Sequence, residues 1–187
     1  MKHIILASNS PRRRELLAGL NLDFEVRVLP GIPENYPRSL PASEVAGFIA
    51  REKADAYRET IGQNDLVVTA DTVVVVGNEI LGKPKDAEDA RRMLRLISGR
   101  IHQVVTGVCL LTADKERCFS VTTDVTFKQL SEEEVTYYIE NYKPFDKAGS
   151  YGIQEWIGYV GVTSISGSYF NVMGLPVQRV WEEIKKL

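Results

Sequence analysis

Blocks of apolar and polar residues alternate along the chain and predict several strands. Short apolar runs at 3–7 and 23–28 have the length and alternation of strands. The run 66–76 is dominated by β-branched residues, which is typical of a buried strand in an α/β sheet. Two long β runs, 103–111 and 117–127, flank a short polar turn and predict an antiparallel hairpin. The pattern therefore indicates an α/β fold.

Helical periodicity occurs between most of these strands. Ser131 with Glu134 forms a capping box and Asp86 is a suitable N-cap, so both sites mark helix starts. The predicted helices cover 11–18, 43–60, 86–97, 131–142 and 177–187. The segment 29–41 holds four of the eight prolines and is expected to be an exposed loop. The segment 146–154 is expected to begin as a turn and continue as a strand.

Three consecutive arginines follow the first predicted strand, in the first turn of a helix where the dipole disfavours cations. Ser10 is a suitable N-cap for this helix. By angular position Arg13 lies near the middle of the apolar arc, Arg12 on its flank and Arg14 toward solvent. Two interpretations stay open. Either an internal carboxylate pairs with Arg13, or Ser8, Ser10, Arg12, Arg13 and free helix N–H groups bind a phosphate.

Asp71 interrupts the most apolar run of the chain. A carboxylate in a buried strand is rare unless it is paired, bound to a metal or catalytic. Asp71 is therefore the best candidate for a chemical carboxylate, although a structural salt bridge is an alternative. Because side chains alternate along a strand, a joint role of Asp71 and Thr72 would require the strand to end or kink near Ala70.

Three further charged residues have ordinary structural interpretations beside a role in a site. Lys53 lies near the apolar centre of its helix, where it either runs along the core edge, pairs with Glu52 or serves a site. Glu34, in the proline-rich loop, is either ordinary surface charge or a site residue. Lys83 follows a short strand on a turn, where a lysine is usually solvated.

The chain has 187 residues, of which 44% are hydrophobic and 26% charged, and its net charge is −2. These values suit a single domain over residues 1–187 and exclude a broad basic field for nucleic acid. No apolar run approaches the length of a membrane span, so no membrane partner is expected. Cys109 is expected in the core, and the two cysteines fit free thiols in a reducing cytoplasm. His102 is expected to form structural hydrogen bonds.

Several short motifs occur in a specific order and cover essentially the whole chain. They are Ser8-x-x-x-Arg12-Arg13-x-Glu15-Leu16-Leu17, Glu52-Lys53-Ala54, Ala70-Asp71-Thr72-Val73, Leu81-Gly82-Lys83-Pro84, Ser98-Gly99 with His102 and Thr106-Gly107, Lys147-Ala148-Gly149 through Gln154, and Asn171 through Pro176. Together they resemble the Maf family of nucleoside-triphosphate pyrophosphatases, first associated with inhibition of septum formation.

The resemblance implies an elongated, twisted mixed β-sheet flanked by helices, as in inosine triphosphate pyrophosphatases, with the nucleotide in a cleft between two lobes. It implies hydrolysis of a nucleoside triphosphate between the α and β phosphates, with a divalent cation, Mg²⁺ or Mn²⁺. It also implies a homodimer. The alternative is a nucleotide-binding regulator of cell division without significant turnover.

The resemblance also implies roles for individual residues. Asp71 is implied as the proton acceptor for the attacking water and, with Glu34, as a metal ligand. The residues implied in binding the triphosphate or choosing the substrate are Ser8, Arg12, Arg13, Lys53, Thr72, Lys83 and Gln154. Gln154 resembles the branch that acts on dTTP and UTP. Two positions depart from the commoner pattern: Pro33 stands where a second acidic residue is frequent, and Glu155 where glycine is frequent.

Overall fold

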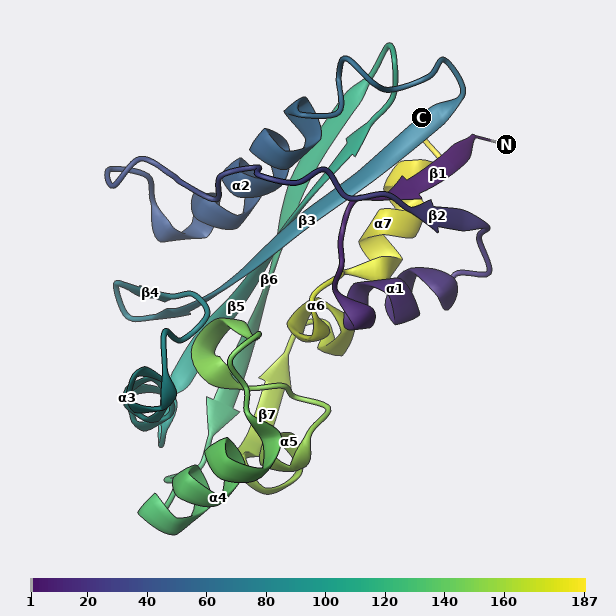
Figure 1. Ribbon diagram of the computed structural model, residues 1–187. Coiled ribbons are helices and arrows are strands. Elements are labelled where there is room, and N and C mark those ends of the chain that lie inside the picture. Colours follow the sequence, from purple (N-terminus) through teal and green to yellow (C-terminus); the bar gives the residue numbers. More distant parts are fainter. Residues whose placement is uncertain (1) are drawn as a thin grey trace. The chain divides into compact units, whose positions relative to one another are not determined.

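The computed structural model describes residues 2–187, and within them one mixed β-sheet is the central element (Figure 1). Its hydrogen-bonded strand order is β2-β1-β3-β5-β6-β7, and β4 pairs with β3. The strands are β1 (His3–Leu6), β2 (Phe24–Val26), β3 (Asp65–Val76), β4 (Glu79–Leu81), β5 (Ile101–Leu111), β6 (Glu116–Phe127) and β7 (Val162–Ser166). Pairs β1–β2 and β1–β3 are parallel, whereas β3–β4 and β6–β7 are antiparallel. The sheet is twisted and unclosed, which confirms the predicted mixed α/β fold.

Helices connect most of these strands and begin largely where their capping residues predict. They are α1 (Pro11–Ala18), α2 (Ala42–Asp55), α3 (Ala87–Ile97), α4 (Glu132–Tyr142), η1 (Ala148–Ser150), α5 (Trp156–Gly161), α6 (Tyr169–Met173) and α7 (Val177–Ile184). The Ser10 and Asp86 side chains cap α1 and α3. Ser131 and Glu134 form the predicted capping box of α4. Within residues 2–187, no helix has the length and apolarity needed to cross a membrane.

The structure differs from the predicted elements at three places. Helix α2 ends at Asp55, because the chain then forms turns in which Tyr57 N–H donates to Ala54 O. The predicted strand within 146–154 is absent from the described chain, since the short helix η1 occupies it and Gly149 has a φ of 68°. The elements α5, β7 and α6 were not expected from the pattern.

The chain divides into two compact units, to both of which β3, β5 and β6 contribute residues. The first unit comprises Met1–Asp71, Thr106–Val121 and Gly174–Leu187. Its core contains a buried cluster made of Ile5, Ala50, Ala54, Tyr57, Val67, Cys109 and Leu111. The second unit comprises Thr72–Val105 and Thr122–Met173. Its interior includes three rings in edge-to-face contact, those of His102, Phe127 and Tyr151.

Helix α2 lies in direct backbone contact with strand β5 in the first unit. A Cβ atom built on Gly107 would lie 2.3 Å from the carbonyl carbon of Ala46 and 2.3 Å from the nitrogen of Gly47. Such distances are not sterically possible, so only glycine at position 107 permits this approach. The contact brings α2, which carries Lys53, close to the sheet.

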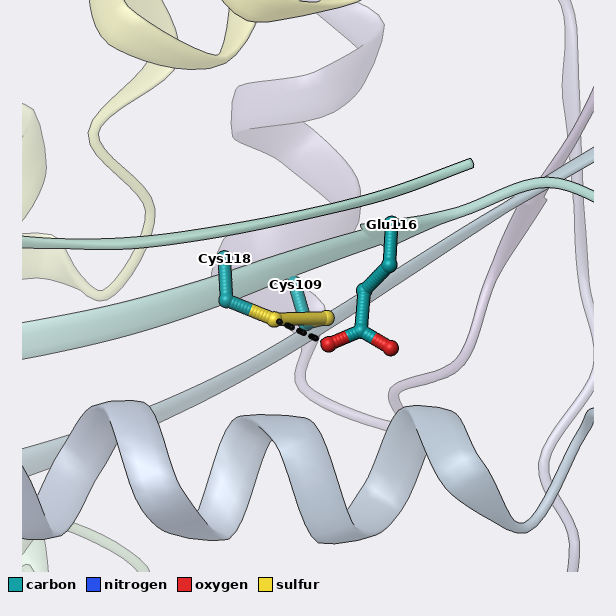
Figure 2. Close-up of side chains that lie close together, drawn as sticks. All are labelled: Cys109, Glu116 and Cys118. Atoms are coloured by element: carbon teal, nitrogen blue, oxygen red, sulfur yellow. Dashed lines mark hydrogen bonds between the residues drawn. A yellow bond between two sulfur atoms is a disulfide. The ribbon is translucent and has the colours of Figure 1, made fainter. Parts of the chain in front are cut away.

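Cys109 and Cys118 lie on the neighbouring strands β5 and β6 and are joined by a disulfide (Figure 2). The prediction of two free thiols is therefore wrong. Cys109 is fully buried, which confirms its predicted place in the core. The spacing of the two cysteines carried no signal for this bond, because it depends on how the two strands of the hairpin pair.

Candidate active site

Three charged residues of the first unit form a continuous chain of ion pairs. Lys53 Nζ lies 2.9 Å from Asp71 Oδ1 and 2.7 Å from Glu34 Oε1. The side chains of Asp71 and Lys53 are 14% and 15% exposed, whereas that of Glu34 is 51% exposed. Lys53 therefore pairs with two carboxylates distant in sequence, not with its neighbour Glu52 as one interpretation expected.

Asp71 and Thr72 are both half-buried. The residues on either side of them in strand β3 are buried. Burial raises the pKa of the Asp71 carboxyl, and the nearby charge of Glu34 raises it further. The ammonium of Lys53 and the guanidinium of Arg13 act in the opposite direction. Asp71 is thus a carboxylate whose proton affinity is increased by its surroundings while it remains within reach of cations.

The beginning of helix α1 adds hydroxyl and guanidinium groups to the first unit. Ser8 is buried, and its Oγ accepts a hydrogen bond of 3.3 Å from Ser10 N–H. Ser10 Oγ in turn accepts from Arg13 N–H at 3.4 Å. Arg12 and Arg13 are half-buried and Arg14 is exposed, as their angular positions predict.

Arg13 has partners of two kinds. Its Nε donates a hydrogen bond of 2.8 Å to the backbone carbonyl of Gly174. Burial lowers the pKa of its guanidinium, whereas the charges of Asp71 and Glu34 raise it. The charges of Asp71 and Glu34 thus act on Arg13, and both interpretations stay predictions: an internal carboxylate as its partner, or phosphate binding at Ser8, Ser10, Arg12 and Arg13.

The donor set of this cluster fits a divalent cation. One carboxylate oxygen of Asp71 and one of Glu34 both contact the Lys53 ammonium, so the two carboxylates converge on the same position. Mg²⁺ is usually held by one or two carboxylates together with substrate phosphates. Asp71 and Glu34 could therefore hold such an ion, and their role as metal ligands stays a prediction.

Three of the predicted site residues belong to the second unit. Strand β3 continues to Val76, so it does not end near Ala70, and the joint role of Asp71 and Thr72 stays a prediction. Lys83 is exposed on the turn that follows β4. Gln154 is half-buried, and its Oε1 is shielded from solvent without a hydrogen-bond partner among the described residues. A buried amide oxygen without a partner is costly unless a ligand satisfies it.

A polar network beside Gln154 was not assigned from the sequence. Lys147 is buried and its Nζ lies 2.9 Å from both Asp146 Oδ1 and Glu155 Oε1. Tyr138 OH donates to Glu155 Oε2 at 2.6 Å and accepts from Gly152 N–H at 3.0 Å. The departure from the commoner glycine at position 155 is the one sequence signal that could have indicated this network.

Two other polar residues form hydrogen bonds within the second unit, and for His102 this structural role was expected from the sequence. His102 is buried, and its Nε2 lies 2.6 Å from Tyr151 OH. Burial lowers the pKa of this imidazole to about 4, so the ring is neutral near pH 7. Asn171 Nδ2 donates to Val104 O and to Thr123 Oγ1, at 3.1 and 3.0 Å.

The twisted mixed sheet with flanking helices places the chain in one fold class with two solved proteins. A HAM1 protein from Coxiella burnetii matches with a TM-score of 0.51 and 14% identity over all of both chains. The Staphylococcus aureus Ham1 protein matches with a TM-score of 0.50 and 17% identity, over 67% of this chain and 72% of that one. At these identities the likeness concerns the fold alone.

The chain belongs to the Maf family, because the model described as "Maf-like protein" matches residues 3–187. Three similar relatives are each named "dTTP/UTP pyrophosphatase". The relative from Phocaeicola vulgatus is 61% identical over 98% of this chain and 95% of its own length. That from Bacteroides fragilis is 56% identical over the same shares. That from Porphyromonas gingivalis is 54% identical over 97% of this chain and 92% of its own.

Proposed function

We propose that this protein is a dTTP/UTP pyrophosphatase that removes these nucleotides, and modified pyrimidine nucleotides, from the nucleotide pool. It hydrolyses the bond between the α and β phosphates and releases a monophosphate and pyrophosphate. The names of relatives that are 54–61% identical over nearly the full chain support this proposal. The observation that carries it is the half-buried Asp71 carboxylate, which is paired with Lys53 and whose pKa is influenced by the charge of Arg13.

Asp71 is the base of the proposed reaction. Hydrolysis needs a group that orients a water molecule and accepts its proton as the water attacks phosphorus. A carboxylate with a raised pKa accepts a proton more readily than an ordinary one, provided that it stays ionised at the working pH. Lys53, at 2.9 Å, favours that ionised form and fixes the orientation of the carboxylate.

Cations stabilise the negative charge that develops on the phosphates. In the first unit Arg12, Arg13 and Ser8 bind phosphate oxygens, since guanidinium groups and helix N–H groups both suit them. Asp71 and Glu34 hold Mg²⁺ or Mn²⁺, which supplies Lewis acidity toward the phosphates when bound. In the second unit we assign Lys83 to the triphosphate, and Thr72 to substrate choice together with Arg12.

The substitution Asp71→Asn tests the reaction. It is expected to abolish pyrophosphate release from dTTP and UTP with Mg²⁺ or Mn²⁺, because an amide accepts no proton from water. Burial raises the pKa of Asp71, so the ionised group costs folding stability, and the variant is expected to melt no earlier than the parent protein.

The matched control is Asp65→Asn, which makes the same change in the same strand. Asp65 binds His3, so this variant is expected to keep its turnover. Full activity of Asp71→Asn would refute the assignment. If the parent protein binds dTTP without metal-dependent hydrolysis, the non-hydrolysing regulator is favoured instead.

Gln154 is proposed to select the base. Its amide presents a donor and an acceptor, which matches the edge of a pyrimidine ring, and its Oε1 lacks a partner among the described residues. Gln154→Ala is expected to change the ratio of kcat/KM between nucleotides with different bases, with a smaller effect on triphosphate affinity. The exposed Gln63→Ala is the control. An equal loss for every nucleotide would contradict this role.

Two further properties are part of the proposal. A cytoplasmic location is supported by the substrate class, since nucleotide pools are found there. A homodimer is supported by the resemblance to the family, and sedimentation of the purified protein tests it.

A further inference from the structure

The two cysteines of the first unit differ strongly in exposure. Cys118 is exposed on β6, whereas Cys109 on β5 is fully buried. Cys109 packs in the core cluster together with Ala50, Ala54 and Tyr57. A reagent that arrives from solvent therefore reaches the Cys118 sulfur, and the Cys109 sulfur is protected.

One carboxylate lies beside the Cys118 sulfur, and two arginines pair with that carboxylate. Cys118 Sγ lies 3.5 Å from Glu116 Oε1, the contact dashed in Figure 2. The same carboxylate oxygen is 2.9 Å from Arg51 Nε. Arg58 pairs with the second oxygen of Glu116 and also with Asp55. In the reduced pair, the Cys118 S–H is placed to donate to Glu116, and Arg51 lies next to that contact.

These opposite charges act on the ionisation of the Cys118 thiol in opposite directions. A nearby guanidinium favours the thiolate, whereas a nearby carboxylate disfavours it. Arg51 pairs with the Glu116 oxygen that faces the sulfur, so a guanidinium lies next to the carboxylate that contacts Cys118. The thiolate is the form of cysteine that reacts with oxidants.

We propose that Cys118 is a hydroperoxide-reactive thiol, that Cys109 is its resolving partner, and that the disulfide is their product. The Cys118 thiolate attacks one oxygen of a hydroperoxide, so an S–O bond forms and the O–O bond breaks. The leaving hydroxide or alkoxide takes up a proton, and Cys118 becomes a sulfenic acid. The Cys109 sulfur then attacks the Cys118 sulfur, and the hydroxyl group departs as water with the Cys109 proton.

The electrons balance in this sequence, since the peroxide gains two electrons and the thiol pair loses two. A small dithiol reverses it in two steps: one thiolate attacks Cys118 Sγ and releases Cys109 as a thiol, and its second thiol then displaces Cys118 from the mixed disulfide as the dithiol closes to its own disulfide. The resolving step also protects Cys118, because a sulfenic acid that finds no thiol is oxidised further and irreversibly. The reaction uses no residue of the Asp71 cluster, so it is independent of the proposed nucleotide chemistry.

The test begins with protein that is reduced with dithiothreitol, freed of reductant and treated with hydrogen peroxide. Thiol titration and intact mass are followed over time. The parent protein is expected to lose both thiols together and two hydrogens in mass, without added oxygen. Cys109→Ser is expected to gain oxygen at Cys118, and Cys118→Ser to keep its Cys109 thiol. Oxygen addition in the parent protein, or equal reactivity of Cys109 in Cys118→Ser, would overturn the proposal.

Two variants of opposite effect test the role of the surrounding charges. Arg51→Ala is expected to slow the loss of the Cys118 thiol several-fold, since it removes the cation that favours the thiolate. Glu116→Gln is expected to accelerate it, since it removes the opposing charge. Arg14→Ala, an exposed arginine on α1, is the control and is expected to react at the parent rate. If both test variants change the rate in the same direction, the electrostatic part of the proposal is wrong.

Discussion

Asp71 is subject to opposing influences, and the balance between them decides its protonation. Burial and the charge of Glu34 raise its pKa, whereas Lys53 and Arg13 lower it, and the net direction is upward. The group acts as a base only when ionised. Activity is therefore expected to fall as the pH decreases through a pKa above the ordinary aspartate value of about 3.9.

The dependence of kcat/KM on pH checks this expectation, and Glu34→Gln sharpens it. The variant removes a negative charge that raises the pKa of Asp71, so the acidic limb of the profile is expected to move to lower pH. This shift is separate from any loss of rate caused by weaker metal binding. A limb that stays in place or moves to higher pH would show that Asp71 does not control it.

His102 affects folding stability at acidic pH. Burial lowers the pKa of the folded imidazole from 6.5 to about 4, so the unfolded chain binds more protons between these values. The stabilisation is present above pH 6.5 and is lost as the pH falls toward 4, by about 3 kcal/mol in total. Urea unfolding between pH 7 and pH 4 measures this loss.

His102→Gln is expected to lose less stability than the parent protein over the same interval, since glutamine does not titrate. The exposed, non-titrating Gln63→Ala is the control, and its pH dependence is expected to follow that of the parent protein closely. Identical pH profiles of His102→Gln and the parent protein would contradict the proposed linkage.

At the scale of elements, helix α7 is held to strand β6 by one buried carboxylate. Glu183 is fully buried on α7 and accepts hydrogen bonds from Arg117 on β6, at 2.8 Å, and from Arg179 and Lys186, at 2.8 and 3.0 Å. The bond from Arg117 is the main cause that lowers the pKa of this carboxyl to about 2. The ion pairs thus connect the end of the chain to the middle strands of the first unit.

Glu183→Gln is expected to destabilise the protein by about 2 kcal/mol, because three cations then lose their charged partner. The folded-state pKa lies below the ordinary value, so the contribution of Glu183 is present above pH 4.5 and is lost as the pH falls toward 2. Thermal melting at pH 7 measures the effect. Glu182→Gln, the exposed neighbour on the same helix, is the control, and equal melting temperatures of the two variants would contradict this role.

At the scale of the whole molecule, local rules predict the beginnings of elements better than their ends. Ser10, Asp86 and Ser131 mark helix starts correctly, because an N-cap bonds only to the following turn. The turns that follow α2 also make distant contacts: the Tyr57 hydroxyl donates to Arg27 O and accepts from Leu29 N–H. No periodicity within α2 reports such contacts.

The candidate site shows the same division between local and distant information. Asp71 is recognisable from the sequence because a carboxylate interrupts a buried apolar run, and Arg13 because its angular position conflicts with its charge. Their partners are not recognisable in this way. Gly174 supplies a backbone carbonyl to Arg13 from 161 residues away, and Glu34 reaches Lys53 from a loop without periodic pattern. Only the family resemblance grouped Glu34, Lys53 and Asp71 in one site.

The contact between α2 and β5 has a consequence for how this protein tolerates mutation. Every replacement of Gly107 adds at least one carbon atom where the backbone of Ala46 and Gly47 already lies. Even the smallest replacement, alanine, would therefore force the backbone of α2 or β5 to move, so alanine is not a conservative substitution at this position. Libraries that seek new nucleotide preferences should leave position 107 constant, while the exposed face of α2 remains open to variation.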